Sequence, residues 1–191
     1  MINEKEIESM LYLLDDSDDR VVDHIADKLF AMGPAIVPYL EKTWPEETNV
    51  KRQERIIEII KNISQKALAH KLSEWKNSSE KDLLQGMLII NQIIDPDIDP
   101  QVIDNKLDKL KLDAWLELNY DLTSFEKVKI LNHIIFDVHK FRGDTENYHH
   151  SQNSFLSTVL ERKKGNPVSL AIIYSIVAQR LNIPVYGVNL P

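Results

Sequence analysis

Apolar side chains recur every three or four positions along most of this chain, which is the period of an α-helix. The first apolar stripe covers residues 7–14 and ends in the acidic cluster 15–19. The second covers residues 21–29 and stops at Gly33–Pro34, where a glycine suited to a helix C-terminus precedes a residue that cannot continue a helix. The pattern predicts two successive helices separated by a short turn.

The same period continues through residues 36–40 and through residues 49–72, the latter forming one long helix or two joined near Ser64. Two more helices are expected at 83–94 and 125–139, each opened by a capping box in which a hydroxyl bonds forward and an acid reaches back. The residues of these two boxes are Ser79–Asp82 and Thr123–Glu126.

A single segment favours a β-strand. Val185–Asn189 follows a proline and combines β-branched with aromatic residues. A lone strand leaves its backbone hydrogen-bonding groups unpaired, so self-association of the protein through this edge is expected.

Charge and composition exclude several classes of function. The chain has 191 residues, 23 Lys and Arg against 30 Asp and Glu, and a net charge of −7, which disfavours binding to nucleic acid or to anionic membranes. It contains no cysteine, which removes disulfides, thiolate nucleophiles and zinc–thiolate sites. No apolar run reaches the roughly 18 residues that a membrane span needs, and the start is acidic, so a cytoplasmic protein is expected.

The N-terminal part resembles a repeat family. The segment from Leu13 to Leu40, with its Leu-Leu-Asp-Asp start, its stripe 21–29 and its Gly33–Pro34 stop, resembles a HEAT-type helical repeat. The resemblance implies paired helices that stack, and we assign residues 1–95 to a HEAT-like helical region. Residues 95–100 form a joining loop, and a second domain covers residues 100–191.

From residue 131 onward the chain holds a series of specific residues in a fixed order, namely Phe141, Gly143, Tyr148, Asn153, Ser154, Glu161, Arg162, Gly165, Pro167, Leu190 and Pro191. This series resembles the transglutaminase-like N-terminal domain of SirB-type bacterial proteins. Such domains are similar in outline to transglutaminases and papain-like enzymes, in which a cysteine opens a central helix packed on a sheet that bears a histidine and an acid.

The resemblance implies a mainly α chain, in which a HEAT-like or irregular helical bundle precedes the helical half of a transglutaminase-like fold with at most one or two short C-terminal strands. It also implies that the histidine of the family would follow Pro191. We therefore expect a domain truncated at its C-terminus.

The expected nucleophile position holds a proline. Asn166 is suited to cap the buried helix that follows, and Pro167 suits its first position, which has no use for an N–H group. Alignment with the transglutaminase pattern puts Pro167 where the cysteine belongs, and a proline ring has no nucleophile. Gly165, just before the cap, is expected to take a left-handed or close-packed conformation. No catalytic residue, metal or cofactor is predicted.

Two sharper interpretations concern the same region. Ser169 could replace the cysteine with His149 or His150 as base, but no acid or oxyanion element accompanies it, and the adjacent histidines lack a third metal ligand. Alternatively, an anion could bind at a corner where three cations meet a capped helix start. The residues of this corner are Arg162, Lys163, Lys164, Asn166 and Ser169.

Trp44, Trp75 and Trp115 are expected in the core or between subdomains, with a surface recognition patch as the alternative. We predict a non-catalytic interaction or regulatory module whose partner is another protein. One alternative is a hydrolase-like or acyltransferase-like enzyme completed by residues beyond Pro191 without a cysteine nucleophile. The other is a HEAT-like protein-binding scaffold.

Overall fold

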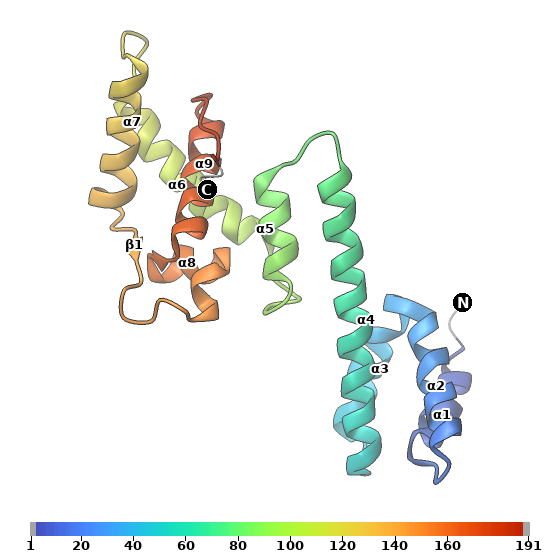
Figure 1. Cartoon of the computed structure of the whole chain (residues 1–191). Helices are drawn as coiled ribbons and strands as arrows, with labels where there is room; N and C mark the ends of the chain where they lie inside the picture. Colours follow the sequence, from blue (N-terminus) through green and yellow to red (C-terminus); the bar gives the residue numbers. More distant parts are fainter. Residues whose placement is uncertain (1–2, 189–191) are drawn as a thin grey trace. The chain divides into compact units, whose positions relative to one another are not determined.

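The computed structural model describes residues 3–188, and its secondary structure is mostly α-helix (Figure 1), which confirms the predicted fold class. Contacts divide the chain into two compact units, Met1–Glu74 and Trp75–Pro191. Each unit has its own core of buried apolar side chains.

The first unit is built from four helices joined by short 3₁₀ turns. They are α1 (Glu4–Tyr12), α2 (Asp19–Met32), α3 (Val37–Thr43) and most of α4 (Val50–Asn77), with the turns Leu13–Asp15, Gly33–Ile36 and Trp44–Glu46 between them. Asp18 caps α2 by accepting from the Arg20 amide at 3.0 Å. Gly33 ends that helix at a φ of +70°, as its position before a proline predicts.

One apolar core holds the first unit together. The predicted stripes supply it, with Ile7 and Leu14 from the first, Ile25 and Leu29 from the second, and Ile56 from α4, all buried. Of the two alternatives that the sequence left open for residues 49–72, one long helix is found, because α4 runs without interruption past Ser64 to Asn77. None of the helices within residues 3–188 is long and apolar enough to cross a membrane.

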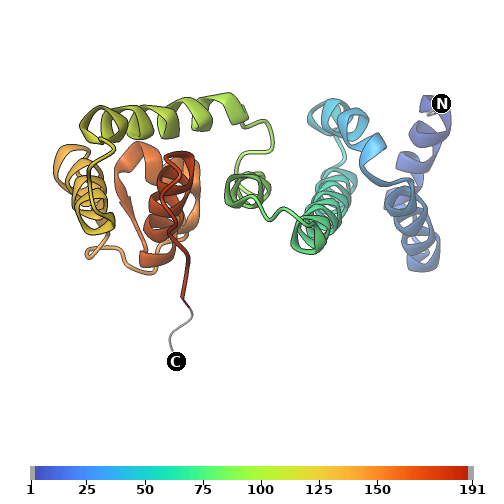
Figure 2. The same ribbon diagram turned by 90° about the horizontal axis from the view of Figure 1, so that it is seen from above.

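The second unit places its helices around one long helix. Its elements are α5 (Leu83–Asn91), α6 (Pro100–Glu117), α7 (Ser124–Asn132) continued by a π-helix (His133–Val138), β1 (Arg142–Gly143), a 3₁₀ turn (Ser151–Ser154), α8 (Leu156–Arg162), β2 (Lys164–Gly165) and α9 (Pro167–Arg180). Helix α6 packs on α7, α8 and α9, and Figure 2 shows it running along one side of this group. Helix α5, which the sequence-based assignment groups with residues 1–95, packs on α8 and α9 within this unit.

One of the two predicted capping boxes is correct. Thr123 and Glu126 bond reciprocally at the start of α7, with the Thr123 amide donating to Glu126 Oε2 at 2.8 Å. The box at Ser79 is wrong, because Asp82 is the cap of α5 and accepts from the Leu84 amide at 2.8 Å. The Asp82 carbonyl also accepts a 2.6 Å hydrogen bond from the Trp75 indole N–H, which holds Trp75 beside the first turn of α5.

The prediction of a strand at Val185–Asn189 is wrong for the residues that the structure describes. Residues 185–188 form no strand, and Asn189 lies outside the described residues. The two strands within residues 3–188 are instead β1 and β2, which pair in parallel with Arg142 opposite Lys164. Alternating β-branched residues favour a strand only where a neighbouring strand supplies hydrogen bonds. Strands β1 and β2 supply these hydrogen bonds to each other. Self-association through 185–189 stays a prediction.

The tryptophans occupy three different environments. Trp44 packs against the core of the first unit, and Trp75 is half-buried. Trp115 is 59% exposed on α6, so the expected core position is wrong for this residue. The reason is that α6 turns Ile103, Leu107, Leu110 and Ala114 inward, and Trp115, which directly follows Ala114, lies outside the face that these four residues share.

Candidate functional site

The start of α9 is built as the sequence predicts. Asn166 caps the helix, because its Oδ1 accepts from the Ser169 amide at 2.8 Å, and Pro167 is the first helical residue. The helix behind it buries Ile173, Ile176 and Val177 in the core of the second unit. The position expected for a nucleophile is therefore held at a well-formed helix N-terminus, but by a ring without a reactive group.

Ser169 is the hydroxyl residue of this first turn, and its hydroxyl group is hydrogen-bonded within the protein. The residue is 2% exposed, and its Oγ donates to the Asn153 carbonyl at 2.7 Å while lying 3.0 Å from the Asn166 carbonyl. His149 and His150 are both exposed, and His150 Nδ1 accepts from the Gln152 amide. Within residues 3–188 neither imidazole hydrogen-bonds to Ser169, so the structure does not pair the serine with either histidine as a base.

A buried carboxylate anchors the loop before α8. Asp144 is 2% exposed, and its Oδ2 accepts from Arg162 Nη2 at 2.8 Å. Its Oδ1 accepts from the Asn147 amide at 3.3 Å, and its own amide donates to the Gly165 carbonyl. Burial alone would raise the pKa of Asp144, but the hydrogen bonds from Arg162 and Asn147 and the charges of Arg162 and Lys164 outweigh it and hold this pKa below its ordinary value.

Asn153 joins that loop to α9. Its side chain donates to the Asn147 carbonyl at 2.8 Å and accepts from Arg162 Nη1 at 3.2 Å. Its carbonyl accepts from the Asn166 amide and from Ser169 Oγ. Asn166 adds a bond from its Nδ2 to Ser154 Oγ at 3.0 Å. We call these residues, Asp144, Asn153, Arg162, Asn166 and Ser169, the α9 polar network.

Gly165 is required by close packing rather than by a left-handed backbone. Its φ is not positive, and a Cβ there would lie 2.6 Å from Ser169 Oγ and 2.9 Å from Val159 Cγ1. The left-handed conformation falls on Lys163 instead, at a φ of 59°. The glycine thus lets β2 approach α8 and the first turn of α9.

The three cations of the predicted anion corner each have a partner within the protein. Arg162 binds Asp144, Lys164 Nζ lies 3.1 Å from Glu146 Oε2, and Lys163 Nζ lies 4.4 Å from the Phe141 ring centre. Burial, with smaller effects of the charges of Lys106 and Lys109, lowers the pKa of Lys163. An anion that paired with Arg162 or Lys164 would compete with the carboxylate of Asp144 or Glu146, whereas Lys163 has no carboxylate partner within residues 3–188.

The other residues of the family-like series take structural or surface positions. Phe141 is buried, Gly143 lies in β1, and Tyr148 and Glu161 are exposed. Leu190 and Pro191 lie outside the described residues. Among residues 3–188 no three His, Asp or Glu side chains converge as a metal-ligand set.

The sequence analysis did not identify two buried polar positions of this region. Asp144 directly follows Gly143, yet nothing in the apolar pattern indicates that its carboxylate is buried. Asn91 lies at the end of α5, is fully buried, and its Oδ1 accepts from the Leu156 amide at 2.7 Å while its Nδ2 donates to Ser157 Oγ. It caps α8 from a helix 65 positions away, a partnership that local spacing cannot reveal.

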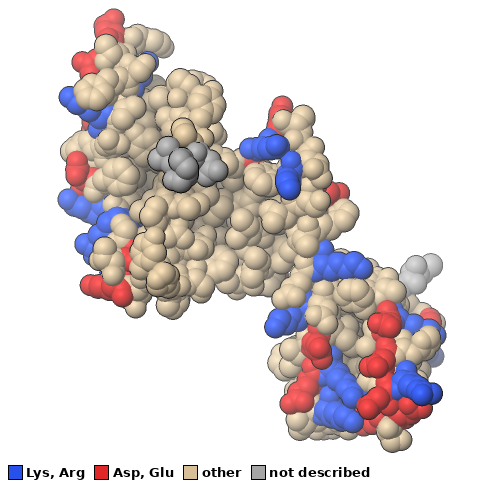
Figure 3. Space-filling model, viewed as in Figure 1, with Lys and Arg blue, Asp and Glu red and all other residues tan. Residues whose placement is uncertain are grey.

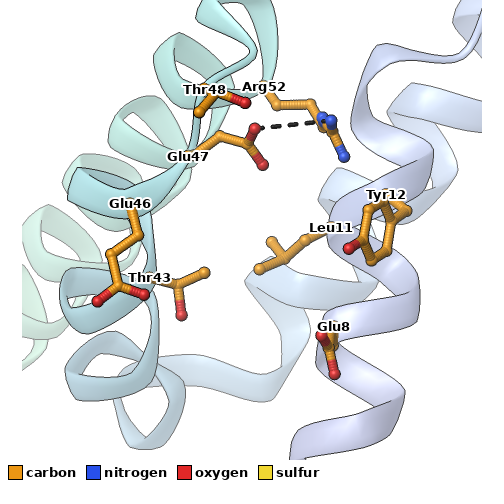
Figure 4. Close-up of a pocket in the computed structure, with 8 residues that line it drawn as sticks. All are labelled: Glu8, Leu11, Tyr12, Thr43, Glu46, Glu47, Thr48 and Arg52. Carbon is orange, nitrogen blue, oxygen red and sulfur yellow. Dashed lines mark ion pairs between the residues drawn. The ribbon is translucent and has the colours of Figure 1, made fainter.

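A separate hollow lies within the first unit. It measures about 270 Å³ and is lined by acidic and hydroxyl side chains around one guanidinium, as Figure 4 shows. Arg52 Nε lies 3.6 Å from Asp15 Oδ2, and its Nη2 lies 3.6 Å from Glu47 Oε1. The guanidinium carbon lies 5.1 Å from the centre of the Tyr12 ring. The charge of Arg52 is thus balanced by its own unit. Figure 3 shows acidic and basic side chains interspersed over this unit, with no large area of one sign in that view.

Comparison with known proteins supports the transglutaminase-like part of the resemblance. Residues 101–191, a little under half of the chain, match the family model of the transglutaminase-like superfamily. A UPF0162 protein of Vibrio cholerae is 29% identical over 110 residues, covering 58% of this chain and 41% of that protein. One from Xylella fastidiosa strain Temecula1 is 32% identical over 124 residues, covering 61% and 43%.

A shorter likeness involves a mammalian protein. F-box only protein 21 of Mus musculus is 34% identical over 61 residues, covering 32% of this chain and 10% of that protein. This chain spans about two-fifths of the length of the two bacterial relatives. No solved structure matches the chain.

Proposed function

We propose that the transglutaminase-like part of this chain is a non-catalytic module through which the protein binds other proteins. It is of the SirB type, acts in the cytoplasm, and follows a HEAT-like helical region. The observation that carries the proposal is Pro167 at the first position of α9. The resemblance to transglutaminases implies that a catalytic cysteine would stand at this position.

The state of Ser169 supports the same conclusion. A serine nucleophile needs a base within hydrogen-bond reach and a lone pair directed at the substrate. Here the hydroxyl donates to a backbone carbonyl and is covered by the loop that Asn153 holds in place. The α9 polar network therefore acts as a structural clamp that joins the loop 144–154, α8 and α9.

The HEAT-like assignment of the N-terminal region is supported by the first unit. Helices α1 to α4 share one core, and residues of the repeat-like segment such as Leu29, Ile36 and Leu40 are fully buried in it. Such helix pairs commonly present a surface to a partner protein.

The test is an acyl-transfer assay on the 191-residue chain, with a glutamine-containing peptide as acyl donor and a fluorescent amine as acceptor. The proposal predicts no product above that of a protein-free blank. Turnover that Ser169→Ala abolishes would overturn the proposal and show that this serine acts in catalysis. Turnover that survives this variant would also overturn it, with another residue as the catalytic group.

A further inference from the structure

The C-terminal end of α6 faces an open hollow in the second unit that the α9 polar network does not use. The hollow measures about 490 Å³ and lies between the end of α6, the loop to α7, the first turns of α7 and the end of α9. Its lining residues that matter here are Lys111, Trp115, Leu118, Tyr120, Lys127 and Arg180.

Large apolar side chains surround this hollow without being covered. Trp115 is 59% exposed and Tyr120 is fully exposed. Leu112 lies one helical turn before both Trp115 and Leu116. Leu112 and Leu116 are more than half exposed and extend the apolar surface along α6. Trp and Tyr dominate the binding energy of protein interfaces, and a contiguous apolar surface of this kind on a polar protein marks an interaction site.

Two of the cations at the hollow lack a partner. Arg180 binds Asp104 and Asp108 at 2.5 and 2.7 Å, so its charge is compensated. The side-chain ammonium groups of Lys111 and Lys127 form no ion pair or hydrogen bond with any residue in 3–188, although both residues are half-buried. In a chain of net charge −7, two uncompensated ammonium groups beside exposed aromatic rings select a ligand that is negatively charged and apolar.

We propose that this hollow, which we call the Trp115 surface, binds a segment of another protein in which Asp or Glu residues flank a large apolar residue. The apolar residue packs on Trp115 and Tyr120, and the carboxylates pair with Lys111 and Lys127. The apolar surface continues past the hollow along α6, which suits a peptide longer than a small ligand. This inference rests on the proposed function, because it names the surface through which that module binds.

The experiment selects random twelve-residue peptides, displayed on phage, on the immobilised 191-residue chain. The enriched peptides are then synthesised, and their affinity is measured by fluorescence anisotropy. The expected consensus combines Asp or Glu with Leu, Phe or Trp. The affinity of such peptides falls at least about tenfold in Lys111→Glu/Lys127→Glu and in Trp115→Ala, and falls with added salt.

The matched control is Lys51→Glu/Lys61→Glu, which makes the same charge change on exposed positions of α4 in the first unit. It should leave the affinity unchanged, and circular dichroism should show that all variants keep their helices. A consensus without acidic residues, or no enriched peptide at all, overturns the proposal. The proposal is also overturned if Lys111→Glu/Lys127→Glu leaves the peptide affinity unchanged. The proposed binding function would then still stand, with its binding surface elsewhere on the protein.

A second copy of this chain is the other occupant to exclude. Sedimentation velocity of the chain alone should show a monomer at concentrations where the peptides bind. A dimer that Trp115→Ala dissociates would overturn the proposal, because the surface would then be a contact between copies. The acyl-transfer assay reads out the proposed function separately, so the failure of one account does not decide the other.

Discussion

Arg162 donates a 2.8 Å hydrogen bond to the carboxylate of Asp144, a residue 18 positions earlier whose side chain has no solvent-exposed surface. The guanidinium itself is 30% exposed. The pair therefore links the end of α8 to the loop after β1 with the acid inside and the base at the surface. Removing the acid frees a cation that solvent can reach, whereas removing the base leaves a buried carboxylate alone.

Asp144→Asn should lower the urea midpoint of unfolding at pH 7, because the charged hydrogen bond from Arg162 is lost. Glu146→Gln is the control, since Glu146 is an exposed carboxylate that pairs with Lys164 nearby. Its midpoint should stay close to that of the unchanged protein. Equal midpoints for both variants would show that the Asp144–Arg162 bond does not stabilise the fold.

The same carboxylate makes stability depend on acid pH. The pKa of Asp144 is lower in the folded chain than its ordinary value, so its contribution is present above the unfolded pKa of about 3.9 and is lost as pH falls through the folded value. The difference in midpoint between the unchanged protein and Asp144→Asn should therefore shrink below pH 4. A difference that is constant from pH 7 to pH 3 would contradict the lowered pKa.

Gly165→Ala should destabilise the chain by about 1–3 kcal/mol, because the added methyl would overlap Ser169 Oγ and Val159. Gly143 offers the control in the paired strand, since a Cβ there meets nothing within 4 Å. Gly143→Ala should change the free energy of unfolding by less than about 0.5 kcal/mol. Similar costs for the two alanines would remove the close approach assigned to Gly165.

Asn91→Ala should cost about 1–3 kcal/mol of unfolding free energy, because it leaves the Leu156 amide and Ser157 hydroxyl without their buried acceptor and donor. Gln85→Ala, on the exposed face of the same helix, should cost less than about 0.5 kcal/mol. Thermal melts followed by circular dichroism measure both. If Asn91→Ala and Gln85→Ala have the same melting temperature, α8 does not depend on the cap from Asn91.

Thr123→Ala should weaken α7 by about 1 kcal/mol and raise the pKa of Glu126 toward its ordinary value. The side-chain and backbone hydrogen bonds with Thr123 are the largest causes that lower this pKa, ahead of the charge of Lys129. NMR titration of the Glu126 carboxyl measures the change, with Ser124→Ala as the neighbouring control. An unchanged titration in Thr123→Ala would contradict the box.

Helices and caps with local causes were predictable from the sequence. Gly33, the Thr123 box and the Asn166–Pro167 start of α9 each depend on residues a few positions apart. They were correct because a helix terminus satisfies its backbone groups with whatever polar side chain is adjacent. At the Ser79 box, the acid of the proposed pair became the cap itself, and local spacing offered both possibilities.

Long-range polar partnerships were not predictable. The hydrogen bonds of Asp144 with Arg162 and of Asn91 with Leu156 form only when the second unit packs, so no periodicity in the sequence indicates these pairs. Likewise, the exposure of Trp115 depends on which face of α6 the other helices cover. These positions define both the α9 polar network and the Trp115 surface, which is why the candidate sites needed the structure.

The most direct test of the central claim is the intact mass of the 191-residue chain after incubation with a fluorophosphonate that labels activated serines. The account predicts an unchanged mass, because the Ser169 hydroxyl is buried and donates to the Asn153 carbonyl. A mass increase of one probe that Ser169→Ala prevents would show an activated nucleophile at the start of α9, and the module would then be an enzyme.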